Sequence, residues 1–237
     1  NDHFSLMGRF GWDTYSYLIE DRKAVGSASG EFGVTRPDVT SGYSRRDVKF
    51  TETNADFMAR YNQAWESLSL NVLLGTNIRR TSTDDVFSST QGGLIVPGLY
   101  SLGNSIDAQA PPVEAYETIG VNGYFASASL GILNQIYVDA SIRMDQSSTL
   151  PAENNTYFYP AVSASWLWSE LLKDSDWLQL GKLRLGYAQV GNDAPFASIN
   201  DTYFQYPSYG QIPLFSLPRT KNNSELKPER TTSIEAG

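Results

Sequence analysis

The sequence predicts an all-β protein, an antiparallel transmembrane β-barrel segment of about eight strands. Three observations favour this fold. Apolar and polar residues alternate along the predicted strands, long and short connections alternate between them, and no run of about 18 apolar residues could form a spanning helix. Because only helices and closed barrels satisfy their backbone hydrogen bonds in hydrocarbon, strands with one apolar face predict the wall of a barrel.

A period of two residues marks each predicted strand in turn. The strands are expected at 4–13, 55–62, 68–75, 117–131, 136–148, 161–168 and 183–187, and a further one begins within 230–237. Several have about 10–14 residues, whereas strands of soluble proteins usually have about 5–6. A strand that crosses the apolar zone of a membrane needs about 9–11 residues, so these lengths fit a membrane barrel.

The segment 136–148, "IYVDASIRMDQSS", shows the two faces most clearly. Val138 and Ile142 fall on one side, whereas Arg143 and Asp145 fall on the other. An arginine that faced the middle of a bilayer would cost about 2–4 kcal/mol, so the charged side is expected to line a polar lumen. The same reasoning predicts a set of lumen-lining residues: Arg9, Asp13, Arg60, Asn71, Arg79, Asp139, Arg143, Asp145 and Arg184.

The connections between strands differ in length in a regular way. Long polar segments are expected at 16–44, 82–115 and 191–229, an intermediate one at 146–157, and short ones at 64–67, 132–135 and 169–176. Transmembrane barrels combine short periplasmic turns with longer extracellular loops, so the pattern predicts which end of each strand faces outward. Four tryptophans, Trp65, Trp166, Trp168 and Trp177, lie near the short connections and predict an interfacial aromatic girdle, with packing under a turn as the alternative.

Composition excludes several classes of function. A net charge of −8 and a pI near 4.7 argue against a nucleic-acid partner. The chain has no cysteine and a single histidine, His3, so neither the usual zinc sites nor an enzyme built on histidine is expected, and no cofactor is predicted. Asp84 and Asp85 are the best metal candidates, but calcium needs about six to eight oxygen ligands. A solvated loop is the simpler interpretation of this acidic pair.

An uncharged aromatic segment, 203–215, stands out within the last long connection. Its aromatic residues, expected to contact a ligand or partner, are Tyr203, Phe204, Tyr206, Tyr209 and Phe215. Three interpretations remain open: the segment binds sugars or peptides, it docks a partner that closes over the barrel, or it folds back over the barrel mouth.

Four stretches resemble one family, the SusC/RagA-like TonB-dependent transporters. They are "YVDASIRMDQSS", "YFYPAVSASWLWSELL", "WLQLGKLRLGYAQVGND" and "ELKPERTTSIEAG". The matching positions are Arg143, Asp145, Ser147 and Ser148; Pro160, Val162, Ser163 and Trp166; Leu183, Arg184, Tyr187, Gly191 and Asn192; and Leu226, Lys227, Pro228, Glu229, Thr231 and Thr232. Gln146 stands where the family commonly has glycine. The resemblance covers residues 136–237, whereas the preceding residues match only in strand and loop character.

The resemblance implies an importer of the outer membrane of a Gram-negative, Bacteroidetes-like bacterium. Such a protein has a barrel of about 22 strands around a plug. Residues 1–237 would then be part of one transmembrane β-barrel domain, with the plug and the remaining strands outside this sequence. The implied partners are the lipid bilayer, a SusD-like surface lipoprotein that captures substrate, and the TonB complex acting through the plug. The implied substrates are oligosaccharides, peptides or other small nutrients.

Two alternatives from other classes remain open at this stage. The chain could form a small outer-membrane barrel closed at eight strands, serving as an adhesin or structural protein without transport. It could also be a soluble all-β binding domain, because aromatic enrichment alone does not distinguish the two environments.

Overall fold

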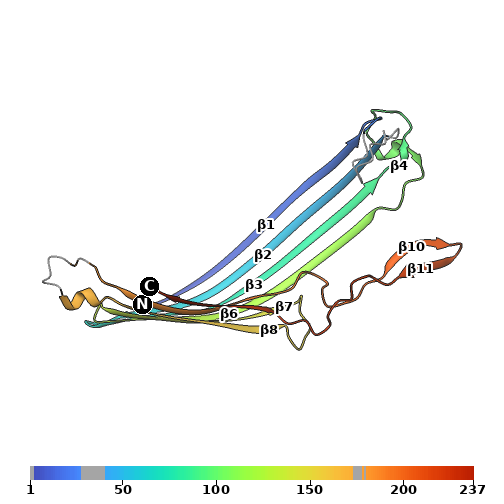
Figure 1. Cartoon of the computed structure of the whole chain (residues 1–237). Coiled ribbons are helices and arrows are strands. Elements are labelled where there is room, and N and C mark those ends of the chain that lie inside the picture. Colours follow the sequence, from blue (N-terminus) through green and yellow to red (C-terminus); the bar gives the residue numbers. More distant parts are fainter. Residues whose placement is uncertain (1–2, 28–40, 173–177, 179) are drawn as a thin grey trace. The chain divides into compact units, whose positions relative to one another are not determined.

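A computed structural model describes residues 3–27, 41–172, 178 and 180–237, and shows one large antiparallel sheet (Figure 1). Eight strands lie side by side in the order β1-β2-β3-β6-β7-β8-β9-β12. Their bounds are β1 Phe4–Lys23, β2 Gly42–Ala64, β3 Leu68–Ser89, β6 Val113–Ile132, β7 Ile136–Ser147, β8 Thr156–Trp166, β9 Leu183–Asn192 and β12 Glu229–Ala236. The predicted all-β antiparallel sheet of about eight strands is confirmed.

Smaller elements lie in the connections between these strands. β4 (Gln91–Leu94) pairs with β5 (Ser105–Asp107), and β10 (Phe204–Tyr209) pairs with β11 (Ile212–Ser216), each in antiparallel fashion. Two short 3₁₀ helices, η2 (Leu102–Asn104) and η3 (Trp168–Leu172), complete the structure of the described residues. No helix in this part of the chain is long and apolar enough to span a membrane.

Two compact units divide the chain. Unit 1 comprises Asn1–Gly11, Thr53–Arg80 and Ile119–Gly237, and unit 2 comprises Trp12–Glu52 and Thr81–Thr118. Strands β1, β2, β3 and β6 contribute residues to both units, whereas β7, β8, β9 and β12 belong to unit 1.

The predicted long loops at 16–44 and 82–115 are wrong in their extent. β1 continues to Lys23 and β2 begins at Gly42, so the first connection is much shorter than predicted. In the second, β3 continues to Ser89 and β6 begins at Val113. The added strand residues do not repeat the apolar alternation found nearer the short turns, and hydrophobic periodicity is the signal on which the prediction depended.

The short connections agree with the predictions. β2 and β3 are joined by residues 65–67, where the Trp65 amide donates to the Leu68 carbonyl at 2.7 Å. β6 and β7 are joined by residues 133–135, and both Leu133 (φ 54°) and Asn134 (φ 57°) have left-handed backbones. Consecutive left-handed residues are typical of the tight hairpin turns whose twist matches that of the flanking strands.

Register is continuous through the strands of unit 1. Between β6 and β7 every residue from Val121 to Ile132 has a partner, and Arg143 lies opposite Phe125. On its other side Arg143 lies opposite Tyr159 of β8. Because side chains alternate across a strand, this register gives the sheet two faces: the polar face, which carries Arg143 and Asp145, and the apolar face, which carries Val138 and Ile142.

Glycines make room for large side chains on the polar face. A Cβ atom at Gly123 would lie 2.5 Å from Nη2 of Arg143 and 2.6 Å from Oδ1 of Asp145. A Cβ at Gly191 would lie 2.8 Å from the Tyr157 ring. Glycine at such positions lets a neighbouring side chain lie flat across the strand, which a larger residue would prevent.

Replacement of Gly123 tests this close packing. We expect Gly123→Val to destabilise the full-length protein by about 1–3 kcal/mol, because the added carbons must displace both members of an ion pair. The measurement is urea-induced unfolding in detergent. Gly186→Val is the matched control, because a Cβ there meets nothing within 4 Å. Equal losses for the two variants would contradict the role given to Gly123.

Candidate functional site

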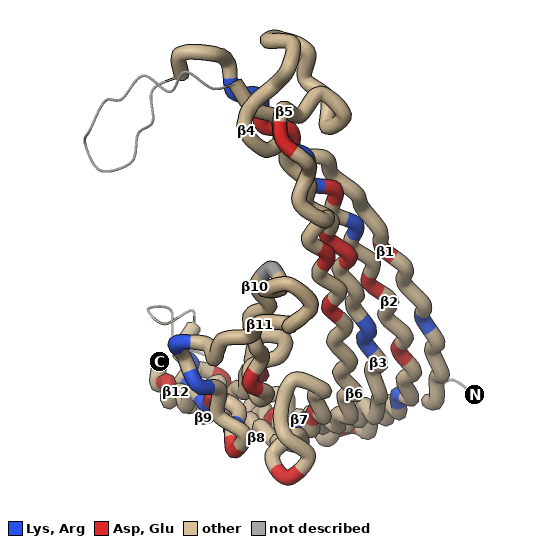
Figure 2. The backbone as a smooth tube through the Cα atoms, turned by 90° about the vertical axis from the view of Figure 1, so that its right-hand side faces the viewer, with Lys and Arg blue, Asp and Glu red and all other residues tan. Residues whose placement is uncertain are grey.

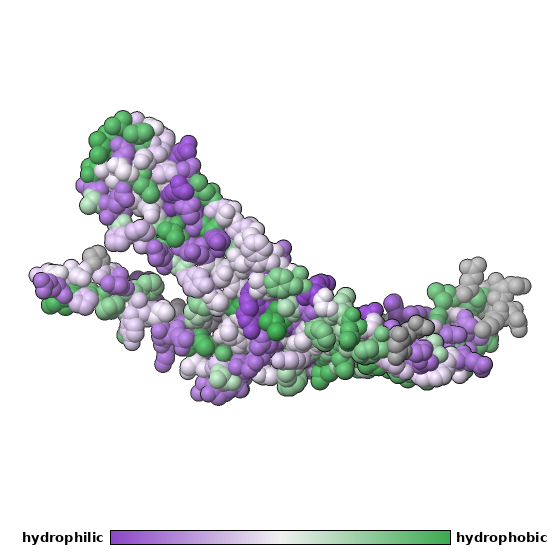
Figure 3. Space-filling model, turned by 180° about the vertical axis from the view of Figure 1, so that it is seen from behind, coloured by the Kyte–Doolittle hydropathy of each residue, from purple (hydrophilic) through white to green (hydrophobic). Residues whose placement is uncertain are grey.

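The apolar face of unit 1 is largely exposed. Ile142 exposes 48% of its surface, Leu185 65% and Ile234 80%, although all three are large aliphatic residues. A hollow of this face between β3, β6, β7 and β8 is lined by Leu74, Tyr124, Ala126, Ile142, Met144 and Phe158. Apolar patches are also visible in the space-filling view (Figure 3). An exposed apolar surface of this extent indicates contact with lipid or with another protein.

The polar face carries the residues that were predicted to line a lumen. On β7, Asp139, Arg143 and Asp145 occupy alternate positions. Arg184 of β9 lies opposite Ser165, which lies opposite Tyr137, so register places Arg184 on the face of Asp139. The charged residues of the chain are distributed along the strands rather than gathered in one patch (Figure 2). That this face borders a lumen stays a prediction.

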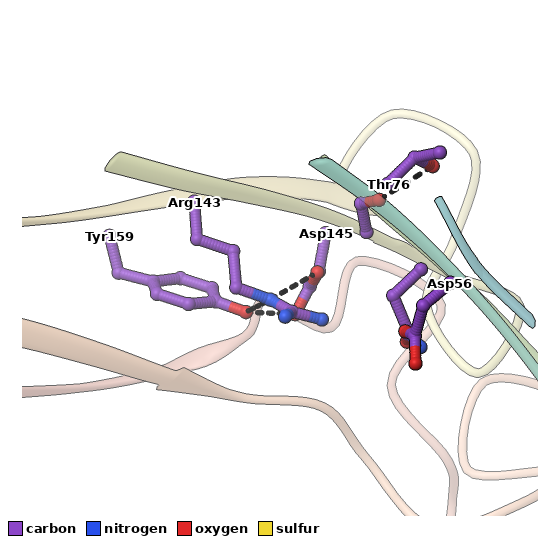
Figure 4. Close-up of polar contacts among 7 residues, drawn as sticks. Asp56, Thr76, Arg143, Asp145 and Tyr159 are labelled. Atoms are coloured by element: carbon purple, nitrogen blue, oxygen red, sulfur yellow. Dashed lines mark hydrogen bonds and ion pairs between the residues drawn. The ribbon is translucent and has the colours of Figure 1, made fainter. Parts of the chain in front are cut away.

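Arg143, Asp145 and Tyr159 form the tightest polar cluster on this face (Figure 4). Nε of Arg143 lies 2.9 Å from Oδ1 of Asp145 and 3.0 Å from the Tyr159 hydroxyl oxygen. The Tyr159 hydroxyl donates in turn to the Asp145 carboxylate. The Asp145 side chain is only 10% exposed, whereas that of Arg143 is 35% exposed. Each of the three side chains therefore has a hydrogen-bond partner, and the cluster places charged groups on the sheet without leaving a buried polar group unpaired.

An aromatic ring and a glycine pack against the Arg143 side chain of this cluster. The Arg143 guanidinium lies over the Phe125 ring, with its Cζ 5.8 Å from the ring centroid. The Phe125 ring in turn occupies the space that a Cβ at Gly75 of β3 would need. Cation–π contact of this kind adds roughly 0.5–2 kcal/mol depending on solvation. The side chain of Arg143 is thereby fixed from three strands, β6, β7 and β8.

A second cluster joins β1, β2 and β3 within unit 1. Nη2 of Arg9 lies 2.6 Å from Oδ2 of Asp56, and Nδ2 of Asn77 donates to Oδ1 of the same carboxylate at 2.6 Å. Figure 4 shows Asp56 on the same side of the sheet as Asp145. Of the predicted residues only Arg9 belongs to this cluster. Asp56 and Asn77 were missed, although both have the strand phase of predicted lumen residues: Asp56 that of Arg60, and Asn77 that of Asn71 and Arg79.

The other predicted residues make no comparable contacts. Arg60 and Asn71 are exposed on β2 and β3, and Asp13 is exposed on β1 in unit 2. Arg79 acts electrostatically on Asp145 without a direct hydrogen bond. Asp139 accepts a hydrogen bond of 2.5 Å from the Ser129 hydroxyl. The structure therefore brings together two small clusters rather than one continuous charged site.

The stretches that resemble the transporter family meet at the end of β7, the end of β9 and the start of β12. The Ser147 hydroxyl donates to Asp193 at 2.6 Å and lies 2.9 Å from the Thr149 hydroxyl, and Ser147 is only 1% exposed. The Ser148 amide donates to the Gly120 carbonyl at 2.9 Å. Glu229, at the start of β12, pairs with Asn192 of β9. These stretches therefore fix where strands end and connections begin.

The two aspartates of the acidic pair, Asp84 and Asp85, have different surroundings. Asp85 lies on β3, not in a loop, and forms an ion pair with Arg46 of β2. Asp84 is exposed, and strand alternation directs it to the opposite face. Throughout the described ranges no group of three or more histidine or acidic side chains could hold a metal ion.

The aromatic segment forms a hairpin rather than an irregular loop. β10 and β11 pair with Tyr206 opposite Leu214 and Phe204 opposite Ser216. The five predicted aromatic residues are exposed, with fractions from 54% for Tyr206 to 79% for Tyr209. The three interpretations of this segment stay open, because the exposure fits each of them.

Three of the four tryptophans of the predicted girdle lie at or next to the short connections between strands. Trp65 lies in the β2–β3 turn, Trp166 ends β8, and Trp168 begins η3. Trp177 is outside the described residues. The girdle itself stays a prediction.

An open antiparallel sheet with one apolar and one polar face defines a segment of a transmembrane β-barrel wall. A family profile described as TonB dependent receptor-like, beta-barrel matches residues 2–237. The chain belongs to this family of Gram-negative outer-membrane barrels. A comparison with curated proteins finds no match.

Solved structures share the fold of the whole chain. A structure described as the RagAB peptide transporter superposes with a TM-score of 0.85 at 17% identity. Two structures of the RagAB peptide importer, in "open-open" and "closed-closed" states, give TM-scores of 0.82 and 0.80 at 17% and 18% identity. Each match covers 100% of this chain and 26% of the solved chain. The chain thus spans about a quarter of the length of these relatives.

The Arg143 cluster provides a test of the polar face. We expect Asp145→Ala to destabilise the full-length protein by about 2–3 kcal/mol, because it leaves a half-buried guanidinium without its carboxylate. Tyr159→Phe removes only a hydroxyl and should cost about 1 kcal/mol. Urea unfolding in detergent measures both losses.

Asp139→Ala is the control for this series, since Asp139 is exposed on the same strand and face. A loss below about 1 kcal/mol is expected there. If Asp139→Ala were as damaging as Asp145→Ala, the cluster would have no special part in holding the wall together.

Proposed function

We propose that the chain forms part of the barrel wall of a TonB-dependent importer of the bacterial outer membrane. In this proposal the apolar face of the sheet contacts lipid, and the polar face lines a lumen that holds a plug. The predicted residues from Arg9 to Arg184, together with Asp56, Asn77 and Tyr159, face that lumen. No catalytic role is part of the proposal.

One observation carries the proposal: continuous register gives neighbouring strands a shared apolar face, with Ile142 and Leu185 exposed on it. In water such a face would be a strong aggregation surface, whereas in hydrocarbon it is the required exterior. The opposite face has charged and hydroxyl-bearing residues that would be costly in lipid.

The size of the barrel follows from the edges of the sheet. β1 and β12 are the two edge strands among the described residues and do not pair with each other. Edge strands in hydrocarbon would leave backbone groups without partners, so in this proposal further strands complete the barrel. This supports a large barrel, as in the family resemblance, over a small barrel closed at eight strands.

The family and the similar solved structures support a proposal for partners and substrates. The similar solved structures are described as peptide transporters and importers. We propose that the complete protein takes up oligosaccharides or peptides, that TonB drives it through the plug, and that a SusD-like surface lipoprotein delivers the substrate. The proposed location is the outer membrane of a Bacteroidetes-like bacterium.

Site-specific labelling tests the two faces. Ser141 and Ile142 are adjacent, both are exposed, and strand alternation directs them to opposite faces. In the full-length protein in membranes, a spin label on Ile142→Cys should be relaxed by oxygen dissolved in lipid. A label on Ser141→Cys should respond instead to a water-soluble nickel chelate. The chain contains no cysteine of its own that would compete for the label.

The opposite labelling pattern, or the same response at both positions, would reject the proposed orientation. Val138→Cys and Asp139→Cys form a second pair on the same strand and should repeat the result. Agreement of both pairs excludes an effect peculiar to one position.

Energy dependence tests transport itself. Cells that depend on the full-length protein for growth on an oligosaccharide or peptide source should stop growing on it when TonB is removed. Growth on a small sugar that diffuses through porins should be unaffected. Uptake that persists without TonB would contradict the importer and leave a passive or structural barrel.

A further inference from the structure

The apolar face of unit 1 changes to a polar row at the strand ends opposite the short turns. The last apolar row consists of cross-strand partners on three strands, Tyr124 of β6, Met144 of β7 and Phe158 of β8. The next row of the same face is also formed by cross-strand partners, but all three are polar and uncharged: Asn122, Gln146 and Thr156. We call this second row the polar row.

The polar row lies at the level where the strands would leave the hydrocarbon. The apolar phase of β7 runs from Ile136 to Met144, a length that matches the roughly 9–11 residues that cross the apolar zone of a membrane. Because short turns mark the periplasmic end of a barrel, the opposite end of this phase belongs to the outer leaflet in the proposed function.

Arg80 of β3 reaches the polar row from the side. Its Nη2 donates to Oδ1 of Asn122 at 2.8 Å, and its Nη1 donates to the carbonyl oxygens of Arg79 at 2.8 Å and Val121 at 3.2 Å. A Cβ atom at Gly120 of β6 would lie 3.2 Å from both Cδ and Nε of Arg80. Glycine at this position therefore lets the Arg80 side chain lie flat across β6, on the face of Asn122.

The charge of Arg80 has no counterion among the described residues. The side chain is exposed, and none of the ion pairs in this part of the chain includes it. Along its own phase the nearest acidic residues are Asp84 on β3 and Glu114 on β6, about 13 Å and about 20 Å further along the strands. Glu117 and Asp145 have the opposite phase. Since a guanidinium has five N–H donors and three hydrogen bonds are made, donors remain for an anion.

An apolar hollow adjoins the polar row on the side of the short turns. It is the hollow between β3, β6, β7 and β8, whose lining includes all three residues of the last apolar row together with Leu74, Ala126 and Ile142. The surface thus places an uncompensated cation and uncharged polar groups directly beside a depression in the face that is proposed to contact lipid.

This arrangement matches a lipid with an anionic head. A guanidinium binds phosphate through paired N–H donors, and the amides of Asn122 and Gln146 and the hydroxyl of Thr156 can donate to further oxygens of the head. An acyl chain in the hollow would bury apolar surface on both sides. A zwitterionic head is less suitable, because its ammonium group would find no carboxylate in the polar row.

We propose that Arg80, the polar row and the hollow form a site for a phosphorylated lipid of the outer leaflet, with the phosphate at Arg80 and an acyl chain in the hollow. The inference rests on the proposed function, from which it takes the orientation of the two faces, and it adds a lipid partner on the outside of the wall. A water-soluble anion would leave the hollow empty and is the less suitable occupant.

Native mass spectrometry of the full-length protein in a neutral detergent tests the site, with monophosphoryl lipid A as the titrated probe. At least one lipid should bind saturably. Arg80→Ala should weaken this binding at least about tenfold, which corresponds to about 1.4 kcal/mol. Ala126→Phe places a ring in the hollow and should weaken it at least about fivefold. This second variant adds only apolar atoms to an apolar face, so it tests the site without removing a polar contact.

Two matched controls accompany these variants. Arg219→Ala removes the same charge from an exposed position in the connection between β11 and β12. Ala140→Phe adds the same ring to the apolar phase of β7 but outside the lining of the hollow. Each should change the affinity for the lipid less than about twofold.

Comparison ligands separate the lipid from its phosphate. The same lipid without its phosphate, and phosphatidylethanolamine, should each bind at least about tenfold more weakly than monophosphoryl lipid A. Inorganic phosphate at the concentration of the lipid should leave the bound lipid in place. Displacement by inorganic phosphate, equal binding of the phosphate-free lipid, or unchanged affinity of Arg80→Ala would each overturn the inference.

The labelling and uptake experiments distinguish this failure from a failure of the proposed function. If the labels at Ile142 and Ser141 and TonB-dependent growth behave as expected while no lipid binding depends on Arg80, the lipid site alone is rejected. A reversed labelling pattern would instead reject the orientation of the faces, on which both proposals depend.

Discussion

Backbone hydrogen bonding between neighbouring strands is the constraint on which the rest of the structure depends. In hydrocarbon no water can replace a missing partner, so each strand must pair along its full crossing length. β7 meets this requirement fully, because each residue from Ile136 to Gln146 has partners on both sides. Uninterrupted pairing also fixes the direction of every side chain, and so one strand cannot exchange its faces independently of the next.

Among the described residues no second layer packs on the polar face of the sheet, so its side chains pack across the strands instead. Glycine at positions 75, 123 and 191 leaves space on this face. The side chains of Phe125, Arg143 and the β8 tyrosines lie across these glycines. Two arginines of this face are held by carboxylates: Arg143 by Asp145 of the same strand, and Arg9 by Asp56 of the adjacent strand. The family-like stretches serve the same purpose, because Ser147, Gly191 and Asp193 meet where strands end.

The sequence predicted the eight strands and the short turns, because apolar alternation and turn residues are local signals. It did not predict that β1, β2 and β3 continue into the segments 16–44 and 82–115. There the alternation of apolar and polar residues changes sense, and a method that seeks one consistent apolar face finds none. It found Arg143 and Asp145 by phase but missed Asp56, Asn77 and Tyr159, whose roles depend on cross-strand register. Register is a non-local property that no single strand reveals.

The apolar and polar phases exchange along β1, β2 and β3, as expected of strands that pass from one solvent into another. In the proposed barrel the environment outside the sheet near the short turns is apolar, so apolar residues face lipid and charges face the lumen. Past Trp12 and Ile78 the positions of the apolar phase carry Glu20, Arg45 and Asp47, which water favours. Positions of the polar phase there carry aromatic rings such as Tyr15 and Phe50. In this proposal the exchange of the two phases therefore marks where the strands pass from hydrocarbon into water.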